Sequence, residues 1–153
     1  MVVSLVAGAL RERTERDPGE LLRLLNRTLQ GQTEGGFVTC CAIRFEPAGR
    51  LRLANAGHLA PYLDGCEIPV PSGLPLGIAA GMAYEKSVVA FPVGATLAVV
   101  SDGVVEASNS KRELFGFDRT REISTKPPAE IAAAARAWGQ NDDITVVTVR
   151  RRT

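Results

Sequence analysis

The stretch TLAVVSDGVVEA, residues 96–107, places the strongest constraint on how this chain can fold. Its apolar and β-branched run, residues 97–100, predicts a buried strand, and a short helical segment is expected after it. Between the two lies Asp102, followed directly by a glycine. A carboxylate at the end of a buried strand must be paired, hydrogen-bonded or bound to a metal, because removing an unpaired charge from water is costly. A turn with Asp102 as helix N-cap satisfies the same condition, so this stretch alone leaves both interpretations open.

Composition limits the classes of partner. The chain has 153 residues, enough for one domain with its own core, and we expect a single domain over residues 1–153. The formal net charge is +1 and aromatic residues make up 5%, so neither nucleic acid nor an anionic membrane is an expected partner. The three cysteines, Cys40, Cys41 and Cys66, match neither a disulfide framework nor a zinc site, which favours a reducing cytoplasm.

The N-terminal residues predict a helix over residues 2–16. The first ten residues, MVVSLVAGAL, are apolar but too short to span a bilayer, and no basic residue precedes them as in a signal peptide. They run into the charged segment RERTER, which is typical of a helix surface. The predicted helix has no capping residue at its start, so we expect a further segment to precede it.

A second helix is predicted next, with Asp17 as N-cap and Pro18 at the first helical position. Its apolar stripe of helical period consists of Leu21, Leu22, Leu24, Leu25 and Leu29. Asn26 lies beside this stripe and is expected to form hydrogen bonds. After a glycine-bearing loop, residues 37–45 and 51–54 predict a β-hairpin joined by the turn EPAGR.

The middle of the chain predicts short strands and one long ordered loop. Residues 60–63 predict a short strand that ends in a tight turn at Asp64-Gly65. Residues 69–81 predict a loop rather than a strand, because prolines cannot donate to a sheet. The apolar residues of this loop, which are expected to pack against the body of the protein, are Leu74, Leu76 and Ile78.

The second half predicts two more strands, a surface loop, a helix and a last strand. Residues 86–91 and 96–100 are expected to pair with each other through the turn Pro92-Val93-Gly94. Residues 108–122 are polar and predict a surface loop with a hydrophobic foot. The alanine-rich residues 129–138 predict a helix, and residues 144–150 predict the last strand.

The segment Asn55-Ala56-Gly57-His58 contains the only histidine of the chain. A single histidine cannot build a histidine-rich metal site, and no cysteine lies at ligand spacing from it. A structural role is favoured, in which His58 bonds a backbone carbonyl or a nearby acid. A role beside the substrate remains the alternative.

A second acidic pair, Asp142-Asp143, lies at the entrance of the last predicted strand, whereas Asp102 lies at the exit of another. If these strands are antiparallel neighbours, both sites lie at the same end of one sheet. Three carboxylates gathered there would repel one another unless a cation intervened. Oxygen ligands suit Mg²⁺ or Mn²⁺, ions that typically serve phosphoryl chemistry. A turn with local side-chain bonds is the other interpretation of Asp142-Asp143.

Five motifs in order resemble those of the metal-dependent protein phosphatases (the PPM, or protein phosphatase 2C-like, family). The bacterial branch with the SpoIIE phosphatase and the RsbU-like stress regulators is the most similar. The motifs are NAGHLAPYL at residues 55–63, GLPLGI at 73–78, VVSDGVVEA at 99–107, LFGFDR at 114–119 and NDDITVVTVR at 141–150.

The resemblance implies an α+β fold, with an antiparallel β-sandwich flanked by helices in α-β-β-α layers. It implies a serine/threonine phosphatase in which two Mn²⁺ or Mg²⁺ ions activate a water that attacks phosphoserine or phosphothreonine. Asp102 and Asp142 match metal ligands of the family and are the implied catalytic residues. Asp143 is implied to hydrogen-bond nearby and Gly103 to permit close packing. Structural roles are implied for the motif residues Asn55, Gly57 and His58.

The sequence departs from the family at its start, because the leading segment with Gly-Asp motifs, which supplies a metal-bridging aspartate, is absent. We therefore expect an N-terminally truncated domain that holds one ion or none, with exposed sheet edges through which it could form a homodimer. The implied partner is a phosphoprotein, such as a phosphorylated anti-sigma-factor antagonist. The alternative function is a catalytically incompetent remnant that binds a partner.

Overall fold

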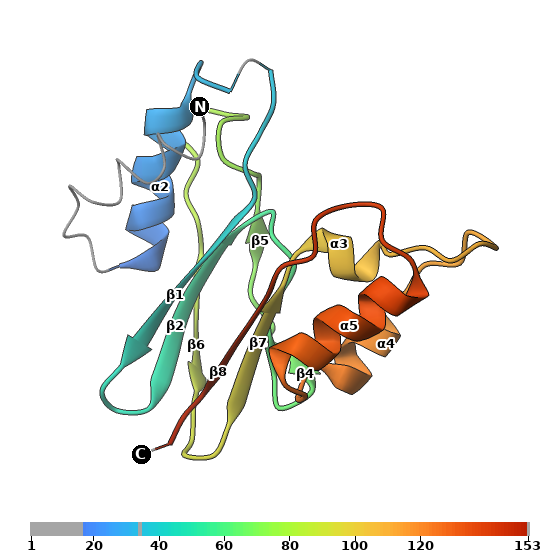
Figure 1. The fold of residues 1–153 in the computed structure, drawn as a ribbon. Coiled ribbons are helices and arrows are strands. Elements are labelled where there is room, and N and C mark those ends of the chain that lie inside the picture. The colour runs from blue at the N-terminus through green and yellow to red at the C-terminus, as the bar shows by residue number, and fades with distance from the viewer. Residues whose placement is uncertain (1–16, 34, 153) are drawn as a thin grey trace. The chain divides into compact units, whose positions relative to one another are not determined.

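The computed structural model describes residues 17–33 and 35–152, which form two compact units (Figure 1). The first unit falls within Met1–His58 and Pro69–Ala90, and the second within Leu59–Ile68 and Phe91–Thr153. The helix predicted over residues 2–16 lies outside the described residues. The α+β class is confirmed, because each unit combines helices with a mostly antiparallel sheet.

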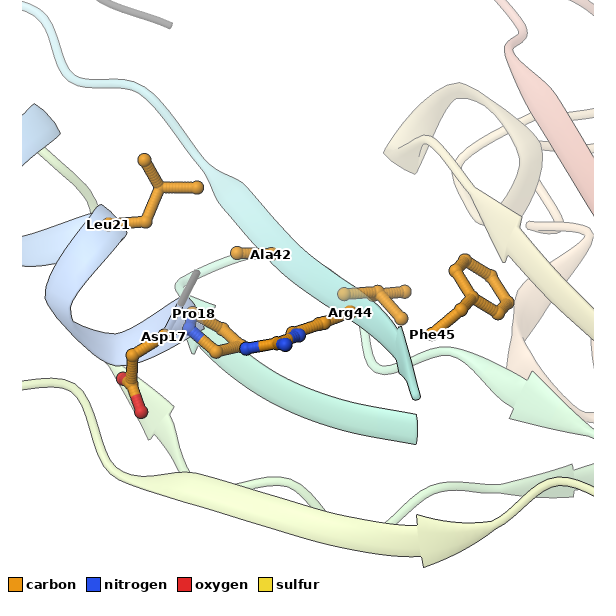
Figure 2. A pocket seen from close by; sticks show the side chains of 7 residues that line it. Asp17, Pro18, Leu21, Ala42, Arg44 and Phe45 are labelled. Atoms are coloured by element: carbon orange, nitrogen blue, oxygen red, sulfur yellow. The ribbon is translucent and has the colours of Figure 1, made fainter. Parts of the chain in front are cut away.

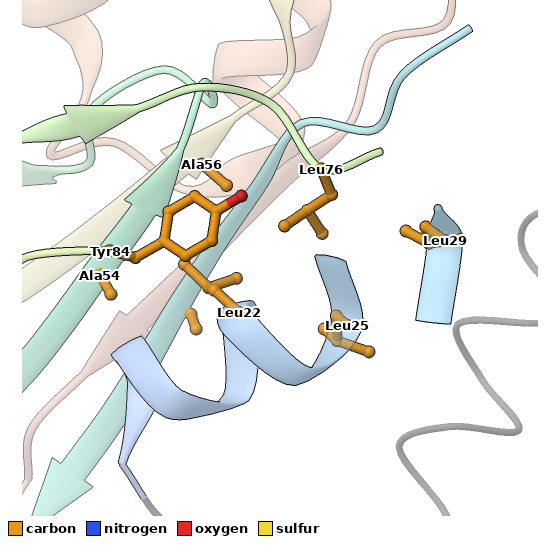
Figure 3. Close-up of a cluster of buried hydrophobic side chains, with 8 residues drawn as sticks. Leu22, Leu25, Leu29, Ala54, Ala56, Leu76 and Tyr84 are labelled. Atoms are coloured by element: carbon orange, nitrogen blue, oxygen red, sulfur yellow. The ribbon is translucent and has the colours of Figure 1, made fainter. Parts of the chain in front are cut away.

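Helix α2 (Pro18–Leu29) covers the sheet of the first unit. Asp17 caps it by accepting a hydrogen bond from the backbone N of Glu20 at 3.1 Å, and Pro18 occupies the first turn, as predicted. Its buried stripe packs against side chains from the strands and from the 74–84 segment, as Figure 3 shows. This cluster consists of Leu22, Leu25, Leu29, Ala42, Ala54, Ala56, Leu76 and Tyr84.

The sheet of the first unit is built on a hairpin of β1 (Cys40–Glu46) and β2 (Arg50–Ala56). The predicted hairpin is confirmed, although β1 begins three residues later than predicted. The other edge of β2 pairs antiparallel with β6 (Lys86–Ala90) and, at its end, parallel with β5 (Ser72–Gly73).

The 69–81 loop differs in two ways from its prediction. It contains the short strand β5, and only Leu76 of its three apolar residues is buried, whereas Leu74 is 47% and Ile78 is 50% exposed. Leu76 is held because its backbone exchanges two hydrogen bonds with Val38. Asn26 of α2 then fixes the next residues by accepting from the N of Gly77 and donating to the O of Ala79, each at 2.8 Å.

The second unit has its own sheet, in the order β4-β3-β7-β8. Its strands are β3 (Tyr62–Leu63), β4 (Cys66–Glu67), β7 (Thr96–Val100) and β8 (Val146–Arg150). The predicted turn at Asp64-Gly65 is confirmed, because both residues have positive φ values, 48° and 84°, and join β3 to β4 as a hairpin.

The predicted pairing of residues 86–91 with 96–100 is wrong. β6 pairs with β2, whereas β7 lies between β3 and β8 and so has no edge left for another strand. The segment between them is bound instead to the chain after β8, because Arg151 donates to the O of Ala95 at 3.0 Å and accepts from the N of Gly94 at 2.9 Å.

Three helices complete the second unit: α3 (Asp102–Val105), α4 (Gly116–Ile123) and α5 (Pro128–Trp138). Helix α5 matches its prediction within one residue. Residues 108–122, predicted as a loop, contain most of α4; its buried face is reduced to Thr120, and Phe117 is 58% exposed, so the apolar period that would indicate a helix is missing. The hydrophobic foot of the loop is Phe115, which is buried.

The core of the second unit is a cluster separate from that of the first. It consists of Tyr62, Ala98, Val100, Val104, Ala107, Phe115, Ile131 and Ala135. Among the helices that the structure describes, none is both long and apolar enough to span a bilayer.

Candidate metal centre

Asp102 and Asp142 lie at the same end of the second unit's sheet. Asp102 follows the end of β7 after one residue, Ser101, and Asp142 precedes β8. The two strands are antiparallel neighbours, with Val100 opposite Val146, so the condition under which the sequence places both acids at one end of a sheet is met.

Ser101 ties the two acidic segments together. Its backbone N donates to the O of Thr145 at 2.9 Å, and its hydroxyl accepts from the N of Thr145 at 2.9 Å. The hydroxyl also donates to the carbonyl O of Asp143 at 3.2 Å. Ser101 occupies the N-cap position of α3 and Asp102 is the first helical residue, so the interpretation of Asp102 as N-cap is wrong.

Gly103 makes the close approach of these segments possible. A Cβ atom at position 103 would overlap the carbonyl oxygen of Asp143, a backbone atom that cannot rotate away. The glycine therefore lets the 142–143 backbone lie directly on the first turn of α3.

Each of the two candidate ligands is partly satisfied by its own turn. The Oδ1 atom of Asp102 accepts from the N of Gly103 at 2.9 Å, and that of Asp142 accepts from the N of Asp143 at 2.7 Å. Both residues are exposed, and within the described chain their Oδ2 atoms accept no hydrogen bond. One oxygen of each carboxylate is thus fixed and the other is available to a cation.

A pocket of about 260 Å³ opens beside Asp142. It is lined by Gly103, Glu106, Ser108, Leu114, Asn141 and Asp142. Sequence reasoning assigned no role to Glu106, Ser108 or Asn141, although all lie within or next to the quoted motifs. Asp102 does not line this pocket, so the structure brings Asp142 together with Glu106 rather than with all the predicted acids.

The candidate donors at this end of the sheet are the carboxylates of Asp102 and Asp142. Within the residues that the structure describes, no three acidic, histidine or cysteine side chains form a metal-binding group, so the expected cluster of three carboxylates is not assembled there. Mg²⁺ needs fewer protein ligands, because it keeps several waters and is commonly held by one or two carboxylates. Asp102 and Asp142 supply that number.

The larger pocket, about 440 Å³, lies in the first unit between the start of α2 and β1 (Figure 2). Its one acid, Asp17, is engaged with the N of Glu20 and with the Nζ of Lys86 at 2.8 Å. Burial by itself would raise the pKa of Asp17, but these hydrogen bonds and the charge of Lys86 lower that pKa overall. Asp17 therefore serves the fold and is a poor candidate ligand.

The residues Asn55, Gly57 and His58 lie in the first unit, where they close the loop after β2. The side chain of Asn55 accepts from the N of His58 at 2.9 Å and donates to its O at 2.7 Å. Gly57 has φ 72°, and any Cβ there would collide with Pro75 at 2.6 Å. These contacts support the structural role that we expect for the segment.

Solved structures with the same fold include PP2C-type phosphatase domains. The chain matches the RsbU and RsbW domains of a Mycobacterium tuberculosis protein with TM-score 0.72 and 24% identity, over 99% of this chain and 47% of that one. It matches the PP2C domain of SiaA from Pseudomonas aeruginosa with TM-score 0.74 and 20% identity, over 97% and 67%. It matches the catalytic domain of the serine/threonine phosphatase PstP, bound to two manganese ions, with TM-score 0.63 and 18% identity, over 96% and 79%. The fold is thus that of the PP2C-type protein phosphatases.

A family model assigns the chain to one branch within this fold. The family model of Stage II sporulation protein E (SpoIIE) matches residues 1–152. The chain belongs to the SpoIIE family. No curated protein gives a significant match. The chain spans about half of the Mycobacterium tuberculosis chain that it matches.

Proposed function

We propose that this domain hydrolyses phosphoserine or phosphothreonine on a regulatory protein, with Asp102 and Asp142 as ligands of Mn²⁺ or Mg²⁺. The observation that carries the proposal is the pairing of β7 with β8, which brings both acids to one end of a sheet. An ion held by these two carboxylates would supply an activated water as nucleophile and positive charge for the phosphate.

The residues around the two acids have supporting roles in this proposal. Ser101 holds the 143–145 backbone against the start of α3, so the spacing of the two carboxylates is fixed before any ion binds. Gly103 allows that contact, and Asp143 contributes its backbone rather than its carboxylate. Pre-set spacing lowers the reorganisation that ion binding would otherwise require.

The proposed substrate is a phosphorylated regulator, for example an anti-sigma-factor antagonist in the cytoplasm. The support is that one structural relative carries an RsbU domain together with an RsbW domain in a single protein. A homodimer through sheet edges also remains a proposal: among the described strands, β1 pairs only with β2.

A non-catalytic role as a partner-binding module is the second candidate. It is favoured because, within the described residues, no three acidic, histidine or cysteine side chains form a group that could hold a metal ion. The two candidates differ in what they predict for Mn²⁺ and for turnover.

Titration calorimetry with Mn²⁺ and hydrolysis of p-nitrophenyl phosphate at millimolar Mn²⁺ separate them. We expect metal-dependent turnover by the wild type, and a loss of at least about tenfold in Mn²⁺ affinity in Asp102→Asn and Asp142→Asn. The matched control is Glu122→Gln, which neutralises an exposed acid of α4. Turnover equal to a metal-free blank, with no binding heat, would leave the partner-binding module as the function.

A further inference from the structure

Residues 108–114 form a hairpin-like loop, called the finger below, next to the candidate metal centre. Its base is closed by an antiparallel bridge between Ser108 and Leu114. Inside it, the backbone N of Asn109 donates to the O of Glu113 at 3.1 Å. The Asn109 side chain accepts from the N of Lys111 at 2.9 Å and from the N of Glu113 at 3.0 Å. The finger is thus internally cross-linked rather than a loose loop.

Side chains from α4 and α5 hold the base of the finger. The indole Nε1 of Trp138 donates to the O of Glu113 at 2.7 Å. The guanidinium of Arg119 donates to the O of Leu114 at 3.2 Å and to the O of Phe115 at 3.0 Å. The same guanidinium lies 4.3 Å from the centre of the Trp138 ring, a cation–π contact that fixes both side chains. The base therefore cannot move without breaking several polar contacts.

The tip of the finger presents two cations to solvent. Lys111 and Arg112 are exposed, and neither side chain forms an ion pair with any described residue. Arg112 has φ 63°, a left-handed conformation that costs about 1–3 kcal/mol for a residue with a side chain. Glycine would satisfy this turn without that cost, so the backbone alone does not account for an arginine at this place.

The base of the finger lines the pocket beside Asp142. Ser108 and Leu114, at the finger's base, line the same pocket as Asp142 and Glu106. Asn141, the neighbour of Asp142, donates from its Nδ2 to the Oγ of Ser108 at 2.5 Å. Leu114 is 54% exposed, so the lining of this pocket also offers an apolar contact.

We propose that the finger docks the substrate polypeptide by binding acidic residues that flank its phosphorylated side chain. Lys111 and Arg112 pair with these acidic residues, and Leu114 contacts an apolar neighbour of the phosphorylated residue. The class of substrate is an acidic phosphopeptide segment. The inference rests on the proposed function, because it takes the pocket beside Asp142 as the place where the phosphate binds.

Fluorescence anisotropy with two labelled phosphoserine peptides tests the proposal. One peptide carries aspartates and glutamates around the phosphoserine, and the other carries asparagine and glutamine at the same positions. We expect the wild-type chain to prefer the acidic peptide by about five- to tenfold at low salt, and the preference to shrink as salt is added. The double variant Lys111→Ala/Arg112→Ala should bind both peptides equally.

Two further variants keep the test decisive. Arg112→Gly removes one charge while suiting the left-handed backbone, so it should lose part of the preference with the finger intact. Lys126→Ala/Arg136→Ala removes two exposed cations elsewhere in the second unit and should keep the whole preference. The proposal is overturned if the wild type binds the two peptides equally or not at all, or if this control loses the preference too.

The binding assay also separates this proposal from the proposed activity. Anisotropy needs no turnover, so a peptide preference that depends on Lys111 and Arg112 supports docking even in a chain that hydrolyses nothing. Metal-dependent turnover without any preference for the acidic peptide overturns docking and leaves the activity standing.

Discussion

Gly103 shows how one residue sets the geometry of the candidate centre. Its missing side chain lets the carbonyl of Asp143 lie directly above the first turn of α3. Ser101 then bonds both Asp143 and Thr145, so the acidic segment has little freedom to move. The position of the candidate centre therefore depends first on these backbone contacts, which bring the segments that carry the carboxylates together.

Substituting Gly103→Ala should destabilise the protein by about 1–3 kcal/mol, because the new Cβ forces the 142–143 backbone away. Urea denaturation followed by circular dichroism measures the change. The control is Gly36→Ala, where the nearest atom to a Cβ, the O of Thr33, lies 3.2 Å away and needs only a small adjustment. Equal stability of the two variants would show that the contact at Gly103 is dispensable.

The sequence identified Asp102 and Asp142 because each lies at the boundary of a β-rich run, a local pattern. No role was predicted for Glu106 and Asn141, because they line a pocket that forms only when residues 103–114 and 141–142 come together. Such a pocket depends on contacts distant in sequence. The finger escaped for a related reason, since its anchors, Arg119 and Trp138, lie on two different helices.

Among the described helices, α2 is the one whose start was predicted to the residue. Its signals, the Asp17 cap and the following proline, act within one turn and so can be read locally. The pairing of β6 with β7 was predicted wrongly, because strands adjacent in sequence need not be adjacent in a sheet. A short connection such as residues 92–95 is compatible with either arrangement.

Asp17→Ala should lower the free energy of unfolding at neutral pH by about 1 kcal/mol, through loss of the N-cap. Because the pKa of Asp17 is lowered in the folded protein, its contribution is present above the unfolded-state pKa and is lost as pH falls through the folded-state value. The difference between wild type and variant should therefore begin to shrink below about pH 4 and fall further as pH passes the folded-state pKa, leaving the part that a neutral carboxyl cap still supplies.

The measurement is urea denaturation at a series of pH values. Asp17→Asn is the matched control, since its side-chain oxygen can still accept from the N of Glu20 while the ion pair with Lys86 is lost. This variant should lose less stability than Asp17→Ala. A difference between wild type and Asp17→Ala that does not change with pH would contradict the assigned role of the carboxylate.

On the scale of the whole molecule, the described chain has two hydrophobic clusters with no residue in common. One is built around the α2 stripe, and the other lies between β7, α3 and α5. Each unit thus carries its own apolar core, a division that no composition shift or linker in the sequence indicates.

We expect substitutions in the two clusters to act independently. Leu25→Ala should cost about 2–5 kcal/mol and Ile131→Val about 0.5–1.5 kcal/mol. The double variant should lose the sum to within about 0.5 kcal/mol, because the sites share no packing partner. Denaturant titration of all four proteins measures this, and a larger deviation would reveal coupling between the two cores.

The position of Trp138 has a practical consequence. It is the only tryptophan of the chain, and its indole is bonded to the finger while a guanidinium covers its ring. Fluorescence excited selectively from this indole therefore reports on the surroundings of Trp138. A ligand that displaces the finger will change the emission maximum and the intensity of Trp138 fluorescence. Binding near the candidate centre can therefore be followed without an added label.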